Sequence, residues 1–318
     1  MQKRNLGNTG IQVSEIAFGG VEIGMPYGIG VNGMEDMLTE KEAVDLLHVA
    51  VEKEFNFFDT ARMYGLSEER MGKAFKNYRN RVVIASKCRH FRTADNILPP
   101  DTAIKKIIHT SIRESLQALQ TDFIDLYMLH QADTEILERQ VIMEEMVRLK
   151  EAGVVRAIGV SVYTTEETRK AIASGIWNVV QLPFNLMDQR QQALFDMATA
   201  AGVGIVIRSV LMKGLLSERN IALHEKLVHV EKHIRQYLGF LDGSFTSLPE
   251  LAVKFALSFP QVSSVLIGID KPDYLEQSRA AADGRYLNAE QLKKAQSFAY
   301  PEPEFLNLVH WNKMGWLK

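Results

Sequence analysis

The apolar and polar positions of this chain follow a repeating order from residue 15 to residue 268. In each repeat, a run of four to seven mostly apolar residues is followed by a polar loop and then by a segment with the apolar spacing of a helix. Runs that are apolar at nearly every position are typical of strands covered on both faces. The pattern predicts eight strands, at residues 15–20, 56–61, 82–87, 123–130, 155–162, 179–184, 204–210 and 263–268.

The segments between these strands have the apolar spacing of helices. Two of them begin with residue types that cap helices: Thr39 followed by Glu42, which forms a capping box, and Ser67 followed by Arg70. The predicted helices cover residues 39–54, 67–77, 101–119, 136–152, 165–174, 189–201 and 248–258. The segments outside the repeat are a hairpin at 2–14, an insertion at 211–247 with a helix at 224–237, and a helix at 288–299 followed by an aromatic tail.

Eight strand and helix pairs in this order indicate a closed (β/α)8 TIM barrel of the α/β class, because closure pairs both edges of the sheet. We expect one domain over residues 1–318, with an N-terminal β-hairpin and an extra C-terminal helix and tail. The alternative is an open doubly wound sheet, which usually has a G-x-G-x-x-G fingerprint after its first strand. The glycines after the first predicted strand lack that spacing, so the barrel is favoured.

The composition favours a small-molecule partner. Of the 318 residues, 37 are Lys or Arg and 39 are Asp or Glu, so no excess charge attracts nucleic acid or an anionic membrane. Cys88 is the only cysteine, which excludes an internal disulfide and a thiolate metal cluster and agrees with a reducing cytoplasm. The first residues lack the apolar core of a signal peptide, and no apolar run has membrane-spanning length. We therefore expect a cytoplasmic protein that binds neither nucleic acid nor membranes.

Polar side chains close several of the predicted strands. Asp59 closes the second strand with Tyr64 just beyond it, Lys87 closes the third, and His130 closes the fourth. Because the carboxyl ends of all strands in a barrel meet at one mouth, these residues would lie together. Each also has an ordinary explanation: an acid can cap a turn, a lysine can reach solvent, and a histidine or tyrosine can pack in the core. Other strand ends carry Ser161, Gln181, Asn185, Arg208 and Ser209.

Proton transfer to a carbonyl group fits the combination of Asp59, Tyr64, Lys87 and His130. A phenol has a pKa near 10, so Tyr64 is a poor acid or base at neutral pH unless a positive charge stabilises its phenolate. Lys87 supplies that charge, and Asp59 would hold the ammonium group in place and keep it protonated. His130 would orient the substrate oxygen or share the proton. The hydride would come from a cofactor, so no nucleophile is required.

In order and context, these residues resemble the catalytic tetrad of the aldo-keto reductase family. The resemblance implies an NAD(P)-dependent oxidoreductase that interconverts a carbonyl compound (aldehyde, ketone or aldose) and the corresponding alcohol or lactone. It makes Tyr64 the general acid in reduction and the base in oxidation. The matching segments are NFFDTARMYG, VVIASK and DLYMLH, with further likeness in LGNTGIQVSEIAFGG, LKEAGVVRAIGVS, VVQLPFN and VSSVLIGIDKPDYLEQS, over nearly the whole chain.

The resemblance also implies where an NAD(P)H cofactor binds. Nicotinamide contacts fall on Ser161 and Gln181, although the family usually has Asn where this chain has Val162. On the seventh strand the family commonly has an aromatic ring that stacks on the nicotinamide, and this chain has Arg208. A guanidinium plane can stack on a ring, but its charge disfavours the cationic oxidised cofactor, and pairing of Arg208 with a carboxylate is the alternative. Pyrophosphate contacts fall on Ser209, Leu211, Lys213 and Gly214, and adenosine contacts fall on Gly268, Asp270, Tyr274, Gln277 and Ser278.

The residues expected to bind the adenosine part of the cofactor favour NAD over NADP. By the same resemblance, members that prefer NADP usually have a basic residue where this chain has Tyr274. Asp270 would repel a 2′-phosphate and can accept a hydrogen bond from a free ribose hydroxyl, whereas Lys271 argues the other way.

Two alternatives belong to other functional classes. A barrel hydrolase or isomerase would bind a metal through Asp59 and His130, but such ions take three or four converging ligands, so no metal is expected. A reductase-like regulatory subunit would bind the cofactor with little turnover.

The expected partner is a small carbonyl compound or sugar. The pocket walls are expected from Met25, Tyr27, residues 211–247, Trp311 and Trp316. Aromatic walls suit sugar faces and hydrophobic aldehydes alike, so the pattern leaves the choice of substrate open.

Overall fold

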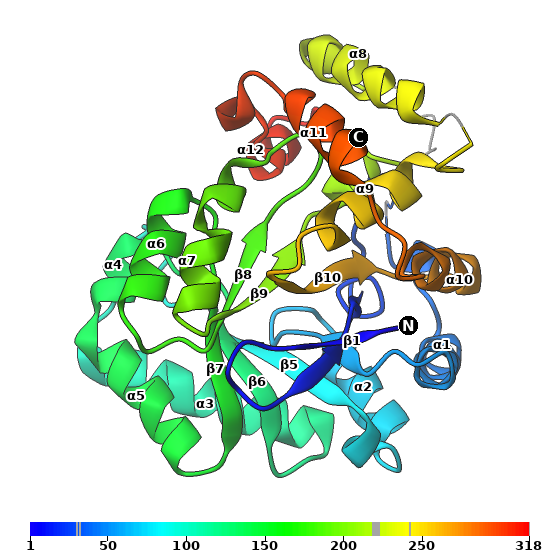
Figure 1. The fold of residues 1–318 in the computed structure, drawn as a ribbon. Helices are drawn as coiled ribbons and strands as arrows, with labels where there is room; N and C mark the ends of the chain where they lie inside the picture. The colour runs from blue at the N-terminus through cyan, green and yellow to red at the C-terminus, as the bar shows by residue number, and fades with distance from the viewer. Residues whose placement is uncertain (30, 32, 218–222, 242, 318) are drawn as a thin grey trace.

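The computed structural model describes residues 1–29, 31, 33–217, 223–241 and 243–317, in which parallel strands close into a barrel (Figure 1). The closed order is β10-β3-β4-β5-β6-β7-β8-β9, so the predicted barrel is confirmed and the open doubly wound sheet is excluded. Each strand lies within two residues of its predicted bounds. The strands are β3 Ile16–Gly19, β4 Phe57–Asp59, β5 Val83–Cys88, β6 Ile124–Leu129, β7 Val155–Ser161, β8 Val179–Pro183, β9 Gly204–Arg208 and β10 Val262–Gly268.

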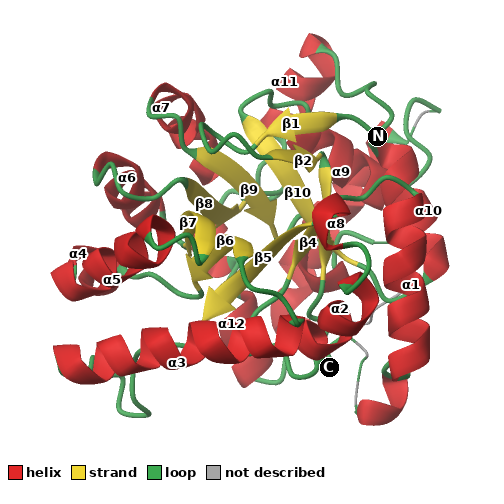
Figure 2. Ribbon diagram, turned by 90° about the horizontal axis from the view of Figure 1, so that it is seen from below, coloured by secondary structure: helices red, strands yellow, loops and turns green. Residues whose placement is uncertain are grey.

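Helices form an outer layer around this barrel, as Figure 2 shows. None of the helices in the described residues is long and apolar enough to cross a membrane. The helices are α1 Glu40–Glu52, α2 Ser67–Phe75, α3 Asp101–Leu119, α4 Thr134–Glu138, α5 Gln140–Glu151, α6 Thr165–Ala173, α7 Phe195–Ala200, α8 Val228–Gln236, α9 Leu248–Leu257, α10 Pro272–Ala281, α11 Ala289–Ser297 and α12 Leu308–Lys313.

Local capping explains where the helix predictions succeeded and failed. The capping box of Thr39 and Glu42 opens α1 as predicted. Ser67 does not cap α2, because its hydroxyl oxygen instead accepts a hydrogen bond from Thr60 at 2.7 Å. The single helix predicted at residues 136–152 is wrong: α4 and α5 are separated by Arg139, whose backbone is extended (φ −77°, ψ 104°).

A hairpin of β1 (Lys3–Asn5) and β2 (Gln12–Ser14) covers the end of the barrel where the strands begin. Three of its apolar side chains, Leu6, Ile11 and Val13, are buried in one cluster with inward-facing residues near the strand starts, such as Phe57 and Val179. Burial of these side chains removes apolar surface from water and closes this end of the barrel. The opposite end, where the strands finish, is therefore the mouth available to a ligand.

Candidate active site

The four residues of the predicted tetrad come together at the mouth of the barrel. Asp59 is the last residue of β4, Lys87 lies one residue before the end of β5, and His130 directly follows β6. Tyr64 lies in the turn that leads from β4 into α2. Because β4, β5 and β6 pair in parallel, their carboxyl ends bring the side chains to one place, as the sequence predicts.

The amino group of Lys87 is the centre of the hydrogen-bond network. It forms a buried ion pair with the carboxylate of Asp59 and donates to the carbonyl oxygen of Thr60 at 3.0 Å. Its distance to the phenol oxygen of Tyr64 is 3.5 Å. On the other side, the amide nitrogen of Gln181 donates to Asp59 at 2.9 Å. An amide, a carboxylate, an ammonium group and a phenol are thus connected in one line.

Tyr64 has a raised pKa, contrary to the expectation that Lys87 lowers it. Burial has the largest effect, and the negative charge of Asp59 adds to it, whereas the charge of Arg208 acts in the opposite direction. Asp59 touches the lysine and offsets its positive charge at the phenol. Tyr64 therefore keeps its proton at neutral pH, which is the form that can donate to a carbonyl oxygen. The pKa of Lys87 is itself lowered, because burial outweighs the effect of Asp59.

His130 is a neutral ring beside the phenol. Its ring centroid lies 5.2 Å from that of Tyr64 and 4.8 Å from that of His90, in both cases edge to face. Burial, together with the charges of Lys87, His90 and Arg208, lowers the pKa of His130 to about 2. A neutral imidazole can orient a substrate oxygen by a hydrogen bond, but it holds no extra proton to share at neutral pH. Of the two roles predicted for His130, the structure favours orientation.

The expected nicotinamide residues lie beside the tetrad. Ser161 ends β7 and pairs in register with Gln181 on β8, and both side chains are buried. The amide nitrogen of Gln181 is already bonded to Asp59, so this residue belongs to the proton-transfer network. The Nδ1 atom of His130 is buried without a hydrogen-bond partner among the described residues. A buried polar atom in this state is a place where a ligand group can bind.

The loop after β9 has the backbone form of an anion site. Ser209, Met212, Lys213 and Gly214 have φ angles of 59°, 48°, 58° and 99°, although only one of them is glycine. Left-handed conformations of non-glycine residues cost about 1–3 kcal/mol each and concentrate at ligand sites. Turns of this kind gather backbone N–H groups into concavities that bind phosphate. The predicted pyrophosphate loop therefore fits a cofactor diphosphate, with Leu211 inside it.

A hydrogen-bonded side chain fixes the start of this loop. Asn185, which follows β8, donates to the carbonyl oxygen of Ser209 at 3.3 Å, and its own oxygen accepts from the backbone N–H groups of Met187 and Asp188. Asp188 in turn pairs with Arg190, which also contacts Glu304 of the C-terminal tail. The ends of β8 and β9 and the tail are thereby joined.

The expected adenosine residues lie at the end of β10 and along α10. Asp270 and Lys271 line a pocket together with Met25 and Tyr27, two of the predicted wall residues. On α10, Gln277 is exposed, Tyr274 is half-buried and Ser278 is buried. Gly268 is exposed at the strand end, where an added Cβ atom would overlap the carboxylate of Glu22.

The C-terminal tail differs from its predicted role in part. Trp311 is completely buried and packs against Phe305 at a centroid distance of 5.4 Å, so it belongs to the core and does not line an open pocket. Trp316 is half-buried and stacks on His224 of the insertion at 5.9 Å. Of the predicted wall segment 211–247, residues 218–222 and 242 lie outside the described part of the chain.

Two residues near the phenol were missed by sequence analysis. The charge of Glu22, three residues after β3, raises the pKa of Tyr64, and Tyr163, two residues after β7, acts in the same direction. Both lie within three residues of a strand end. A search for polar residues just beyond each strand end, and not only at the end itself, would have found them.

This chain departs from the family pattern at Val162 and at Arg208, and the two residues are in contact. Its guanidinium donates to the carbonyl oxygen of Val162 at 2.9 Å and lies 4.2 Å from the ring centroid of Tyr163. Within the part of the chain that the structure describes, no carboxylate lies within 4.0 Å of Arg208. Among the described residues, the predicted alternative of a carboxylate partner for Arg208 is therefore not found.

Gly24 provides a test of how tightly the phenol is held. A Cβ atom at this position would overlap the backbone oxygen of Tyr64 and lie 2.6 Å from the Cβ of Ser67. We expect Gly24→Ala to move the turn that carries the phenol and to lower kcat at least about tenfold, because small misplacements of catalytic groups are costly. Gly239→Ala is the control, since nothing lies within 4 Å of its added Cβ. Equal rates in both variants would contradict a rigid placement.

The described residues contain no group of three or more His, Cys, Asp or Glu side chains that could hold a metal ion. The predicted alternative of a metal-dependent hydrolase or isomerase needs three or four converging ligands, which the described residues do not bring together. The polar groups at the mouth are instead arranged for proton transfer.

Comparison with known proteins agrees with this geometry. The chain is 28% identical to "Uncharacterized oxidoreductase YqkF" of Bacillus subtilis, over 93% of this chain and 96% of that protein. It is 26% identical to L-galactose dehydrogenase of Arabidopsis thaliana, over 95% of each. The solved holo form of aldo-keto reductase AKR11C1 from Bacillus halodurans is similar with a TM-score of 0.79 and 26% identity, covering 94% of this chain and 96% of that one.

The family model described as "Aldo/keto reductase family" matches residues 15–299, which is most of the barrel and its helices. The chain therefore belongs to the aldo/keto reductase family of NAD(P)-dependent oxidoreductases.

Proposed function

We propose that this protein reduces the carbonyl group of an aldehyde, ketone or aldose, with Tyr64 as the proton donor and NADH as the preferred hydride donor. The observation that carries the proposal is the buried line of contacts from Gln181 through Asp59 and Lys87 to the phenol, with the neutral ring of His130 beside it. A raised phenol pKa keeps the acid form present, and a nearby ammonium group stabilises the phenolate that forms.

In the proposed mechanism, the substrate carbonyl oxygen lies between the phenol oxygen of Tyr64 and the ring of His130. The bound nicotinamide supplies the hydride that reduces the carbonyl carbon. Tyr64 gives its proton to the oxygen, so the carbonyl becomes an alcohol and the phenol becomes a phenolate. Lys87 stabilises the phenolate electrostatically until it regains a proton, and Asp59 holds the lysine in place. In the oxidation of an alcohol or aldose, the same groups act in reverse.

The substrate class follows from the walls of the mouth and from one relative. Tyr27 and Tyr163 are 37% and 47% exposed near the phenol, with Lys213 and Arg208 over the two rings, so the exposed remainder of each ring is the aromatic surface that a sugar or an apolar aldehyde could contact. Among the relatives, L-galactose dehydrogenase is named for a sugar substrate. We therefore infer that aldoses deserve the first test, followed by short aldehydes and ketones.

The decisive experiment follows nicotinamide absorbance with purified protein, both cofactors and a panel of sugars, polyols, aldehydes and ketones. We expect turnover of at least one carbonyl compound or its alcohol. Cofactor binding without turnover of any compound would favour the alternative of a cofactor-sensing regulatory subunit. Absence of both binding and turnover would contradict the proposal.

The preference for NADH over NADPH rests on Asp270. This carboxylate lines the pocket at the end of β10, where a second negative charge from a 2′-phosphate would be repelled. We expect Asp270→Ala to improve kcat/KM for NADPH relative to NADH by about tenfold, as the removal of one nearby like charge predicts. Lys271→Ala, the control at the neighbouring residue, should shift the ratio in the opposite direction. An unchanged ratio in both variants would remove the basis for preferring NADH.

A further inference from the structure

Arg208 brings a positive charge to the mouth at the end of β9, where the described residues offer it no acidic partner. Its guanidinium donates to the carbonyl oxygen of Val162 at 2.9 Å and to the hydroxyl of Ser209 at 3.3 Å. In the described parts of the chain, no Asp or Glu oxygen lies within 4.0 Å of it. Partial burial of a cation without a neighbouring carboxylate lowers the stability of the fold. The half-buried charge of Arg208 therefore requires an explanation.

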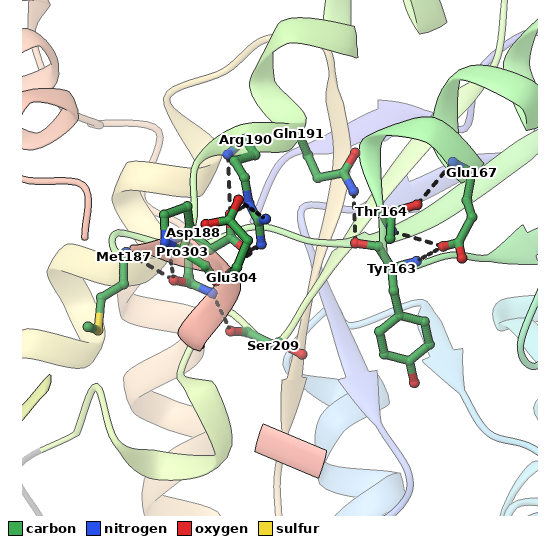
Figure 3. Close-up of polar contacts among 11 residues, drawn as sticks. Tyr163, Thr164, Glu167, Met187, Asp188, Arg190, Gln191, Ser209, Pro303 and Glu304 are labelled. Carbon is green, nitrogen blue, oxygen red and sulfur yellow. Dashed lines mark hydrogen bonds and ion pairs between the residues drawn. The ribbon is translucent and has the colours of Figure 1, made fainter. Parts of the chain in front are cut away.

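The aromatic ring that holds this cation is fixed in place. The guanidinium carbon lies 4.2 Å from the ring centroid of Tyr163. The backbone N–H of Tyr163 donates to Glu167 at 2.8 Å, and its carbonyl oxygen accepts from Gln191 at 3.2 Å (Figure 3). These hydrogen bonds anchor the backbone of Tyr163, and the contacts of the guanidinium with the Tyr163 ring and the carbonyl oxygen of Val162 place the positive charge at the end of β9.

That position lies close to the reacting atoms. Arg208 is the last residue of β9, at the same mouth as Tyr64 and its two neighbours, Lys87 at 3.5 Å from the phenol oxygen and His130 at 5.2 Å between ring centroids. In agreement with this placement, the charge of Arg208 acts to lower the pKa of all three groups. A carbonyl oxygen that takes the proton of Tyr64 must lie within hydrogen-bond distance of the phenol. Its carbon must lie about 3–3.5 Å from the atom that gives up the hydride. The cofactor ring that reacts therefore lies within the reach of the same charge.

We propose that Arg208 sets the relative affinity of this protein for reduced and oxidised nicotinamide, by repelling the cationic oxidised ring and tolerating the neutral reduced one. The inference rests on the proposed function and adds that the protein favours carbonyl reduction, because it binds the reduced cofactor more tightly and releases the oxidised cofactor more readily. At the effective dielectric constant near 20 of a partly buried site, repulsion between neighbouring like charges corresponds to a difference of at least about tenfold in the dissociation constants.

The test is a binding measurement without substrate. Dissociation constants of NADH, NAD+, NADPH and NADP+ are measured by isothermal titration calorimetry for the wild type, Arg208→Gln, Arg208→Lys and Lys213→Gln. Gln removes the charge and keeps a donor for the carbonyl oxygen of Val162, whereas Lys keeps the charge. Lys213, which lies over the ring of Tyr27 at 4.9 Å in the loop after β9, is the matched control. Its contacts to phosphate would be the same in both oxidation states.

We expect the wild type to bind the reduced form at least about tenfold more tightly than the oxidised form. Arg208→Gln should bring this ratio close to one, Arg208→Lys should retain it, and Lys213→Gln should weaken both forms equally. Equal affinities in the wild type, or an unchanged ratio in a folded Arg208→Gln protein that binds both forms, would overturn the inference while leaving the proposed function intact. A wild-type protein that binds neither form would overturn both.

Discussion

Replacing Tyr64 by Phe should lower kcat/KM for carbonyl reduction by about 10²–10⁴-fold, because a positioned general acid contributes that much to the rate. Among the residues that the structure describes, the phenol oxygen has one hydrogen-bond partner, Lys87 at 3.5 Å, which is a long and weak contact. Its loss should therefore change the free energy of unfolding by less than about 1.5 kcal/mol. Steady-state kinetics and cofactor titration together separate the two effects, since affinity for the cofactor should change less than about twofold.

Tyr163→Phe is the matched control for this substitution. Its phenol lies near the same group of charges, but its ring is exposed and its hydroxyl has no hydrogen bond to the described residues. Removing that hydroxyl should leave turnover within about threefold of wild type, as for surface changes in general. Near-normal activity in Tyr64→Phe, or an equal loss in the two variants, would contradict the assignment of Tyr64 as the acid.

Replacing Lys87 by Met should affect both stability and chemistry. The substitution leaves the carboxylate of Asp59 buried without its ion-pair partner, which typically destabilises a protein by about 3–5 kcal/mol. The uncompensated negative charge also lies close to Tyr64 and stabilises its protonated form. The pKa of the phenol should therefore rise further, so that the pH dependence of alcohol oxidation, which needs the phenolate, moves to higher pH.

Chemical denaturation and the pH profile of oxidation measure these two effects separately. The double variant Lys87→Met with Asp59→Asn removes both charges, so it should regain most of the lost stability without regaining activity. If the single Lys87 variant is as stable as wild type and keeps its pH profile, neither the buried ion pair nor the electrostatic role of Lys87 is correct.

The architecture and the tetrad were accessible from sequence because both depend on simple repeats. Apolar runs of strand length fixed the barrel, and the convergence of parallel strands then brought Asp59, Lys87 and His130 together. The direction of the Tyr64 pKa was not accessible, because it depends on the depth of burial and on the contact between Asp59 and Lys87. Neither the depth of burial of the phenol nor the contact between the two side chains can be obtained from the order of the residues alone.

Other differences have equally local causes. The break between α4 and α5 comes from one extended residue, Arg139, in a segment whose apolar spacing continues on both sides. The burial of Trp311 depends on how the tail folds back against the barrel, which involves contacts between distant segments. Arg208 was recognised as unusual, but only the structure shows that Tyr163 and the carbonyl oxygen of Val162 are its partners.

The hairpin that closes the far end of the barrel divides the molecule into two zones with different tolerance of change. Leu6, Ile11 and Val13 bury their side chains among the strand starts, so a substitution there affects whether the chain folds. Mouth residues such as Tyr27 and Arg208 lie outside this cluster. An evolving lineage can therefore exchange mouth residues such as Tyr27 or Arg208, and with them its substrates and cofactor preference, while the closed end continues to hold the barrel together.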